Sequence, residues 1–193
     1  MNFPQSASLT ITNHCNLRCQ MCGQWSQQGY VRTNKDSLKN ELTLTDWKGV
    51  VDELAVHGVP SVLLRGGEVF MFPGIVELLD YIHDKGMFIS IDTNGTMLEQ
   101  FAADIVRIGK MHLTVSVDGP EPVHDAVRGI PGAFQKLKAG SPFSSQFPIY
   151  RIDTIFCEVF IGFGKMMTSN GCLNRVQFVL FPCQLYKYVI RFI

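Results

Sequence analysis

The chain has 193 residues, 46% of them hydrophobic, which is enough for one sizeable core in a single domain over residues 1–193. Its formal net charge is zero and like charges do not cluster, so no electrostatic footprint for nucleic acid or an anionic membrane surface is evident. The first residues lack a basic segment followed by an apolar one, and Pro182, Lys187 and Arg191 interrupt the most apolar stretch. We therefore expect a cytoplasmic protein without a secretory signal or membrane span.

Short apolar or β-branched runs alternate with amphipathic segments up to about Gly140, a pattern typical of repeated βα units and a parallel sheet. Residues 8–12 are predicted as the first strand. Thr45 is predicted to cap a helix over residues 46–57, and Gly58 is placed to end it. The second strand is expected at residues 61–64.

The next helix is predicted to open at Pro73, with apolar residues at helical spacing, and to end before Gly86. A strand at residues 87–91, a helix at about 98–108 and a strand at 112–117 follow. Together these segments predict four βα units.

Beyond Gly140 charged residues become sparse and aromatic residues frequent. Residues 149–155 and 175–180 still have the composition of strands, and they are the candidates for a fifth and a sixth. A weak helix is expected around residues 158–167, with Gly162 and Gly164 inside it. Residues 141–193 are thus expected to be a short or irregular end of the domain.

The most informative motif follows the first predicted strand, where Cys15, Cys19 and Cys22 lie within eight residues. Three thiolates without a fourth leave one coordination position open, whereas structural zinc or iron–sulfur sites are normally closed by four protein ligands. A coordination position that the protein leaves open can bind a small molecule, which favours a reactive site over a structural one. With a cytoplasmic location, this spacing indicates metal binding more than disulfides.

The run CNLRCQMCG, residues 15–23, resembles the signature of the radical S-adenosylmethionine (radical SAM) superfamily, whose CxxxCxxC motif holds three irons of a [4Fe–4S] cluster. In that family S-adenosylmethionine chelates the fourth iron. The resemblance implies an α/β fold, a partial (β/α)6 TIM-like open barrel of parallel strands. It also implies an enzyme that cleaves S-adenosylmethionine reductively to methionine and a 5′-deoxyadenosyl radical.

Ligands of parallel βα folds gather at the C-terminal ends of the strands, and motifs follow each of the four predicted strands. After the second strand, Gly66, Gly67 and Glu68 resemble the GGE motif of the family, whose backbone and acidic residue approach the amino group of the cofactor. Many relatives have proline next, where this chain has Val69. A tight turn between strand and helix is the alternative reading of the two glycines.

Four more residues are assigned to the cofactor by the same resemblance. Ser116 and Asn94 resemble ribose-contacting residues, although the segment around Asn94 is also an ordinary turn. Arg128 resembles an arginine that pairs with the carboxylate of the cofactor, and a surface arginine is the alternative. Met21 stands where relatives often have an aromatic residue near the adenine.

Other readings stay open. His14 could complete a zinc site with the three cysteines, and Cys157, Cys172 and Cys183 are expected to be buried small hydrophobes. The chain could also be a truncated or partner-dependent protein that binds the cluster and S-adenosylmethionine without turnover. The resemblance implies a small-molecule or peptide substrate and an electron donor such as flavodoxin or ferredoxin, and nothing in the sequence selects the substrate.

Overall fold

The computed structural model describes the backbone of residues 4–140, 151–153, 176–179 and 187–190, and the side chains of residues 4–140. Five parallel strands form one sheet in the order β1-β2-β3-β4-β5. They are β1 (Ala7–Thr12), β2 (Ser61–Gly66), β3 (Phe88–Thr93), β4 (Met111–Ser116) and β5 (Arg151–Asp153). The predicted α/β class with parallel strands is confirmed.

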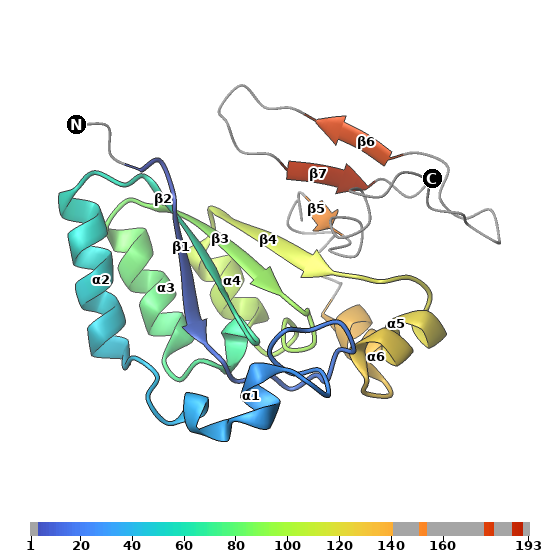
Figure 1. Ribbon diagram of the computed structural model, residues 1–193. Helices are drawn as coiled ribbons and strands as arrows, with labels where there is room; N and C mark the ends of the chain where they lie inside the picture. Colours follow the sequence, from blue (N-terminus) through green and yellow to red (C-terminus); the bar gives the residue numbers. More distant parts are fainter. Residues whose placement is uncertain (1–3, 141–150, 154–175, 180–186, 191–193) are drawn as a thin grey trace.

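Helices and short 3-10 turns connect the strands (Figure 1). They are α1 (Tyr30–Thr33), η1 (Lys35–Leu38), α2 (Leu44–Val56), η2 (Val69–Met71), α3 (Ile75–Asp84), α4 (Ala102–Ile108), α5 (Glu121–Arg128) and α6 (Ala133–Ala139).

The strand order explains why the helices cover one face of the sheet. Parallel strands that are neighbours in both sequence and space are joined by right-handed crossovers, and repeating the same crossover places every helix on the same side. Figure 1 shows α2, α3 and α4 side by side on that face. This is the arrangement of a barrel wall, and it leaves the opposite face free of these helices.

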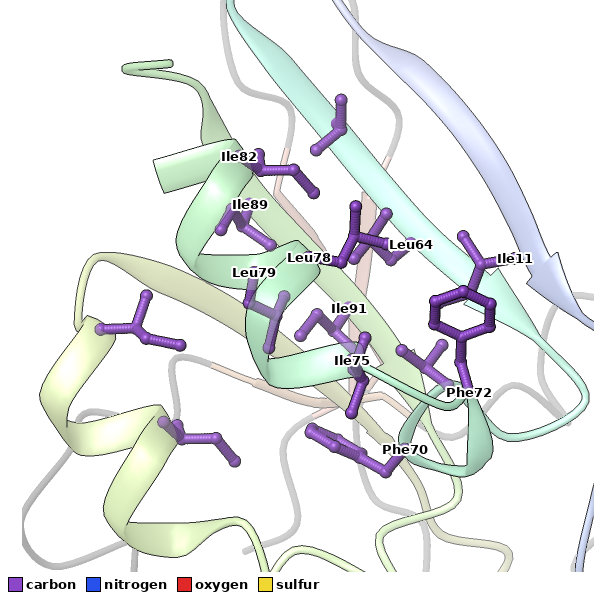
Figure 2. Packing of buried hydrophobic residues seen from close by; sticks show 14 of the residues in the cluster. Ile11, Leu64, Phe70, Phe72, Ile75, Leu78, Leu79, Ile82, Ile89 and Ile91 are labelled. Carbon is purple, nitrogen blue, oxygen red and sulfur yellow. The ribbon is translucent and has the colours of Figure 1, made fainter. Parts of the chain in front are cut away.

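The core lies between the sheet and its helices. Ile75, Leu78 and Ile82 recur at helical spacing on α3 and point toward the buried strand residues Leu64 and Ile91 (Figure 2). Burying each such side chain contributes about 1.5–3 kcal/mol relative to leaving it exposed. The core therefore fixes α3 against β2 and β3, and with them the ends of the strands that follow.

Alternation along the strands sends polar side chains to the opposite face. On β3, Ile89 and Ile91 are buried against the helices, while Ser90 and Asp92 are only partly buried. Successive side chains of a strand point to opposite faces, so a strand with this pattern presents its polar residues to the interior of the partial barrel.

Several predicted boundaries shift in the structure. Thr45 is not the cap of α2: the cap is Thr43, whose side chain accepts from the backbone N–H of Asp46, while the Asp46 carboxylate accepts from the backbone N–H of Thr43. This reciprocal capping box satisfies two groups at the helix start, and Thr45 cannot form it. Gly58 does follow the helix end as predicted, with φ of +69°.

The other boundary differences are small. α3 begins at Ile75 after Gly74 rather than at Pro73, and α4 begins at Ala102 rather than near Leu98. The strands β3 and β4 differ from the predicted ranges by one or two residues at either end. Strand and helix ends are the part of a fold that local sequence specifies least.

The candidate sixth strand differs from the expectation. Val176–Val179 form β6, which pairs antiparallel with β7 (Lys187–Ile190) in a separate two-stranded sheet instead of extending the parallel sheet. A short connection between consecutive strands permits antiparallel pairing, whereas a parallel pair needs a long crossover. The helix predicted around residues 158–167, and Cys157, Cys172 and Cys183, lie outside the described residues.

None of the helices in the described segments combines the length and the apolar character needed to cross a membrane.

Candidate active site

A pocket of about 380 Å³ opens at the C-terminal ends of β1 to β4. Its size is in the range of sites that enclose a small organic ligand. Loops after all four strands contribute to its wall, and the lining includes nine of the ten residues singled out from sequence: Cys15, Cys19, Met21, Cys22, Gly66, Gly67, Asn94, Ser116 and Arg128. The exception is Glu68.

The first wall is the loop after β1, which carries the three cysteines as free thiols. N–H groups point at their sulfur atoms: Leu17 N lies 3.4 Å from Cys15 Sγ, and the backbone N atoms of Gln24 and Trp25 lie 3.3 and 3.4 Å from Cys22 Sγ. Such donors stabilise a thiolate, which is the form that binds metal.

Burial acts in the opposite sense on the free thiols. It raises the pKa of Cys15 to about 11, and it also raises the pKa of Cys19, although the guanidinium of Arg128 lowers the latter in part. A bound metal reverses this balance because a coordinating thiol is deprotonated outright. The site is therefore arranged for thiolates that a metal centre, and not the protein alone, would keep ionised.

Arg18 and Trp25 give the loop its shape. The guanidinium of Arg18 donates to the carbonyl groups of Cys15 and Leu17 at 2.9 and 2.6 Å and lies 4.1 Å above the Trp25 ring. Trp25 Nε1 in turn donates to the Asn13 carbonyl at 2.8 Å. These contacts close the loop on itself, so the positions of the sulfur atoms are set by the protein.

The zinc alternative is not favoured. His14 Nε2 lies 3.9 Å from a Glu41 carboxylate oxygen, and the ring is not part of the pocket wall. In the segments that the structure describes, no three His, Cys, Asp or Glu side chains are close enough together to bind one metal ion. Tetrahedral zinc needs sulfur atoms roughly 3.8 Å apart, given Zn–S bonds of about 2.3 Å. A cluster in which each cysteine binds a different iron needs a wider spacing.

The second wall is the glycine pair after β2, and the structure gives these residues a packing role. A Cβ atom on Gly66 would lie 2.4 Å from the Thr12 carbonyl oxygen, and one on Gly67 would lie 2.2 Å from that of His14. Gly67 N and Glu68 N donate to these same two oxygens at 2.8 and 2.7 Å. Glycine is required here because the strand end and the cysteine loop pair backbone to backbone.

Glu68 lies behind the pocket wall and is 1% exposed. Its carboxylate accepts from the Thr93 hydroxyl at 2.7 Å, from Asn94 N at 2.8 Å and from Phe70 N at 3.2 Å. Burial raises the pKa of Glu68 above its usual range, and the three donors offset part of that rise. The carboxylate thus ties the loop after β2 to the loop after β3, and its contact with a cofactor amino group stays a prediction.

The third wall is the segment after β3, where Asn94 forms both a turn and a bridge. Its Oδ1 accepts from the backbone N and the hydroxyl of Thr96 at 2.9 and 2.6 Å, and its Nδ2 donates to Asn16 Oδ1 at 2.9 Å. Asn16 Nδ2 donates to the Thr96 hydroxyl at 2.8 Å. The segment is therefore the expected turn, and it also anchors the cysteine loop. Asn16 and Thr96 were not singled out from sequence.

The fourth wall comes from the end of β4 and from α5. Arg128 donates to the Asp118 carboxylate through Nε at 2.6 Å and Nη2 at 3.0 Å, and its Nη1 lies 3.7 Å from Cys19 Sγ. His124, fully buried, places Nδ1 3.3 Å from both the backbone N and a carboxylate oxygen of Asp118. Burial lowers the pKa of His124, so the ring is neutral at pH 7.

Asp118 and His124 belong to the segments that follow the fourth predicted strand, but no role was assigned to them from sequence, although a signal was present. His124 and Arg128 are four residues apart and share a helix face, and the strand before them ends close to Asp118. Arg65 and Asp92, which pair at 3.0 Å in the pocket wall, stand in the motifs after the second and third strands and were likewise assigned no role. Two further predicted residues line the pocket: the Met21 side chain is 48% exposed, and Ser116 is buried at the end of β4.

A protein-family model described as the Radical SAM superfamily matches residues 9–140. Fe-coproporphyrin III synthase from Methanosarcina barkeri is 34% identical over 131 residues, which cover 67% of this chain and 31% of that protein. PqqA peptide cyclase from Bradyrhizobium diazoefficiens is 30% identical over 136 residues, covering 69% and 34%. The chain thus spans about a third of the length of the curated relatives it matches.

Among solved structures, the crystal structure of SuiB from Streptococcus suis bound to S-adenosylmethionine superimposes with a TM-score of 0.59 at 19% identity. The match covers 74% of this chain and 32% of that one. At this identity the likeness shows a shared fold.

Proposed function

Because the chain belongs to the radical SAM superfamily, we propose that it is an enzyme that binds a [4Fe–4S] cluster through Cys15, Cys19 and Cys22 and cleaves S-adenosylmethionine reductively. The observation that carries the proposal is the convergence of three free thiols in one pocket at the ends of parallel strands. When bound and reduced, such a cluster supplies the electron that starts radical chemistry.

The donor set of the pocket fits this group. Three sulfur ligands with N–H groups aimed at them suit a cluster with one iron left open, and the closed shape of the loop holds the sulfurs in place. The remaining pocket wall would hold S-adenosylmethionine beside that open position. We assign the binding of S-adenosylmethionine to Gly66, Gly67, Asn94, Ser116 and Met21. We assign it also to Arg128, in the same wall, and to Glu68, directly behind it.

We propose a small molecule or a peptide as the substrate. One relative is named as a synthase of an iron tetrapyrrole and another as a peptide cyclase, so both classes occur among similar proteins. The polar interior face, with Ser90, Asp92 and Arg65, would present hydrogen-bonding groups to either. The work of these residues would be to bind and orient the substrate and to keep water from the reacting atoms.

We also propose the cytoplasm as the location and a one-electron donor such as flavodoxin or ferredoxin as the partner. Free thiols at Cys15, Cys19 and Cys22 suit a reducing compartment. Reductive cleavage consumes an electron, which an external donor has to deliver because none of the proposed ligands is itself a reductant.

Anaerobic reconstitution of the full chain with iron and sulfide tests the proposal. We expect iron and acid-labile sulfide in the protein, an electron paramagnetic resonance spectrum of the reduced sample that changes when S-adenosylmethionine is added, and release of 5′-deoxyadenosine. The variant with Cys15, Cys19 and Cys22 all changed to alanine is the control and should do none of these. Zinc in place of iron, or a cluster whose spectrum ignores S-adenosylmethionine, would contradict the proposal. A responsive cluster that releases no product would favour the non-catalytic alternative.

A further inference from the structure

A buried guanidinium group lies between a carboxylate and one of the three cysteines. Arg128 is 8% exposed, donates two hydrogen bonds to Asp118 and places Nη1 3.7 Å from Cys19 Sγ. The sulfurs of Cys15 and Cys22 accept from backbone N–H groups of their own loop, and Asn94 Nδ2 also lies 4.0 Å from Cys15 Sγ, whereas the donor to Cys19 is a charged side chain. Cys19 thus depends on a residue 109 positions away.

The backbone fixes this contact from both sides. Arg18 N donates to the Arg128 carbonyl at 2.9 Å, and Gln20 N donates to the Val127 carbonyl at 3.0 Å, so the cysteine loop pairs with the last turn of α5. A Cβ atom on Gly129 would lie 2.4 Å from the Arg18 carbonyl oxygen, which shows how closely the two segments approach. The guanidinium therefore sits at a set distance from Cys19.

Asp118 neutralises the charge of the Arg128 guanidinium. A buried guanidinium is tolerated only when it is paired, and the two-pronged contact with a carboxylate that is 2% exposed supplies the pair. The pair carries no net charge, so its main effect on Cys19 is the directed N–H group. His124 packs beside Asp118 and adds no charge while it is neutral.

We propose that Arg128 is a positioning residue that donates an N–H···S hydrogen bond to the Cys19 thiolate and thereby raises the reduction potential of the bound cluster, with Asp118 orienting it. The inference rests on the proposed cluster. Hydrogen bonds to cluster sulfurs are one of the means by which proteins set such potentials, and a donor stabilises the more negative, reduced state more than the oxidised one. This role differs from a contact with the carboxylate of S-adenosylmethionine.

The test is the midpoint potential of the reconstituted protein, followed by electron paramagnetic resonance in the absence of S-adenosylmethionine. We expect Arg128→Gln to lower the equilibrium constant for reduction by up to about tenfold, which is about 59 mV for a one-electron couple. Arg128→Lys should lower it as well, because the single nitrogen of lysine, held at the Asp118 carboxylate, cannot also take the place of Nη1 beside the Cys19 sulfur. An unchanged potential in Arg128→Gln, with weaker S-adenosylmethionine binding, would overturn the inference in favour of the carboxylate contact. A wild-type potential in Arg128→Lys would overturn the directed hydrogen bond.

A matched control is Arg107→Gln. Arg107 also makes a two-pronged contact with an aspartate, Asp80, at 2.8 Å for both nitrogens, but on the helix surface. The Arg107→Gln variant should leave the midpoint potential of the cluster unchanged. A shift equal to that of Arg128→Gln would contradict the specific role of Arg128.

A measurement on the wild-type protein covers the case in which Arg128 variants fail to assemble. With the terminal guanidinium nitrogens of arginine labelled with 15N, pulsed electron paramagnetic resonance of the reduced cluster should detect coupling to a labelled nitrogen. A cluster without such coupling would overturn this inference alone, whereas a chain that binds no iron would overturn the proposed function as well.

Discussion

At the scale of single residues, the site is built from side chains that serve the protein and the pocket together. Glu68 accepts three hydrogen bonds from the loops after β2 and β3, and Asn94 joins its own turn to Asn16 of the cysteine loop. Such buried polar groups are costly when they lose a partner, because the group left behind is desolvated without compensation. We therefore expect substitutions here to act on stability even before any cofactor binds.

Glu68→Gln provides one test. The amide nitrogen of glutamine would face an N–H or O–H donor, so at least one buried donor would lose its acceptor, at a cost of about 1–3 kcal/mol in the free energy of unfolding. Urea unfolding of the cluster-free protein at pH 7 would measure this cost. Glu99→Gln, at an exposed position, is the control and should change stability little.

The pH dependence of that difference follows from the raised pKa of Glu68. A carboxyl whose pKa is higher in the folded than in the unfolded state stabilises the fold fully below its unfolded pKa of about 4.3. This contribution to the free energy of unfolding is lost as the pH rises through the pKa of the folded state. The advantage of wild type over Glu68→Gln should therefore be greater near pH 4 than at pH 8. An advantage that grows with pH would show that the three donors outweigh the burial of Glu68.

At the scale of elements, the cysteine loop is held by backbone pairing that continues past the end of β1. A register shift between Thr10 and Thr12 precedes the loop, and beyond it Gly67 and Glu68 still donate to Thr12 and His14. Irregularities of this kind occur next to active sites, where they redirect the chain. The two glycines after β2 are thus structural parts of the cysteine loop as well as pocket lining.

A pair of glycine substitutions with opposite expected effects tests this arrangement. Gly67→Ala should destabilise the protein and lower its cluster content, since the new methyl group would overlap the His14 carbonyl oxygen. Gly49→Ala, in the middle of α2 with nothing within 4 Å of the new Cβ, should instead stabilise by about 0.5–1 kcal/mol. Thermal unfolding and iron content measure both. A Gly67→Ala protein with wild-type stability would refute the close backbone approach.

At the scale of the whole molecule, the pocket exists because four strand ends meet at one edge of the sheet. The strand order β1-β2-β3-β4, with the helices on one face (Figure 1), brings the ends of the strands together. Cys15, Asn94, Ser116 and Arg128 therefore line the same pocket. A ligand that bridges these loops would link segments that are far apart in the chain. Binding to the folded state alone stabilises that state in proportion to the logarithm of ligand concentration.

Thermal unfolding of the cluster-loaded protein should therefore respond to S-adenosylmethionine. At a concentration 100-fold above the dissociation constant, the expected gain is about 2.7 kcal/mol, or a rise in Tm of about 5–11 °C for a chain of this length. Anaerobic calorimetry of the full chain would measure it, and Cys22→Ala should give a much smaller rise because the open iron would be lost. Equal shifts with and without the cluster would place S-adenosylmethionine elsewhere.

The sequence by itself determined the α/β class, the family and most of the pocket wall. Strand alternation and helical spacing are local properties, and the interval between Cys15, Cys19 and Cys22 lies within eight residues, so all are readable without a fold. Glycine and polar residues after each strand were assigned to the same edge because parallel strands place their ends together.

Only the tertiary structure decided which partner each polar group takes. Arg128 contacts Asp118 and Cys19, Glu68 accepts from the Thr93 hydroxyl behind the pocket wall, and the glycine pair packs against the cysteine loop. These contacts join residues from 10 to 109 positions apart, and they depend on the angle at which α5 and the loops pack, which no local pattern specifies. The strand pairing of β6 with β7, too, was set by the pairing of whole segments rather than by their composition.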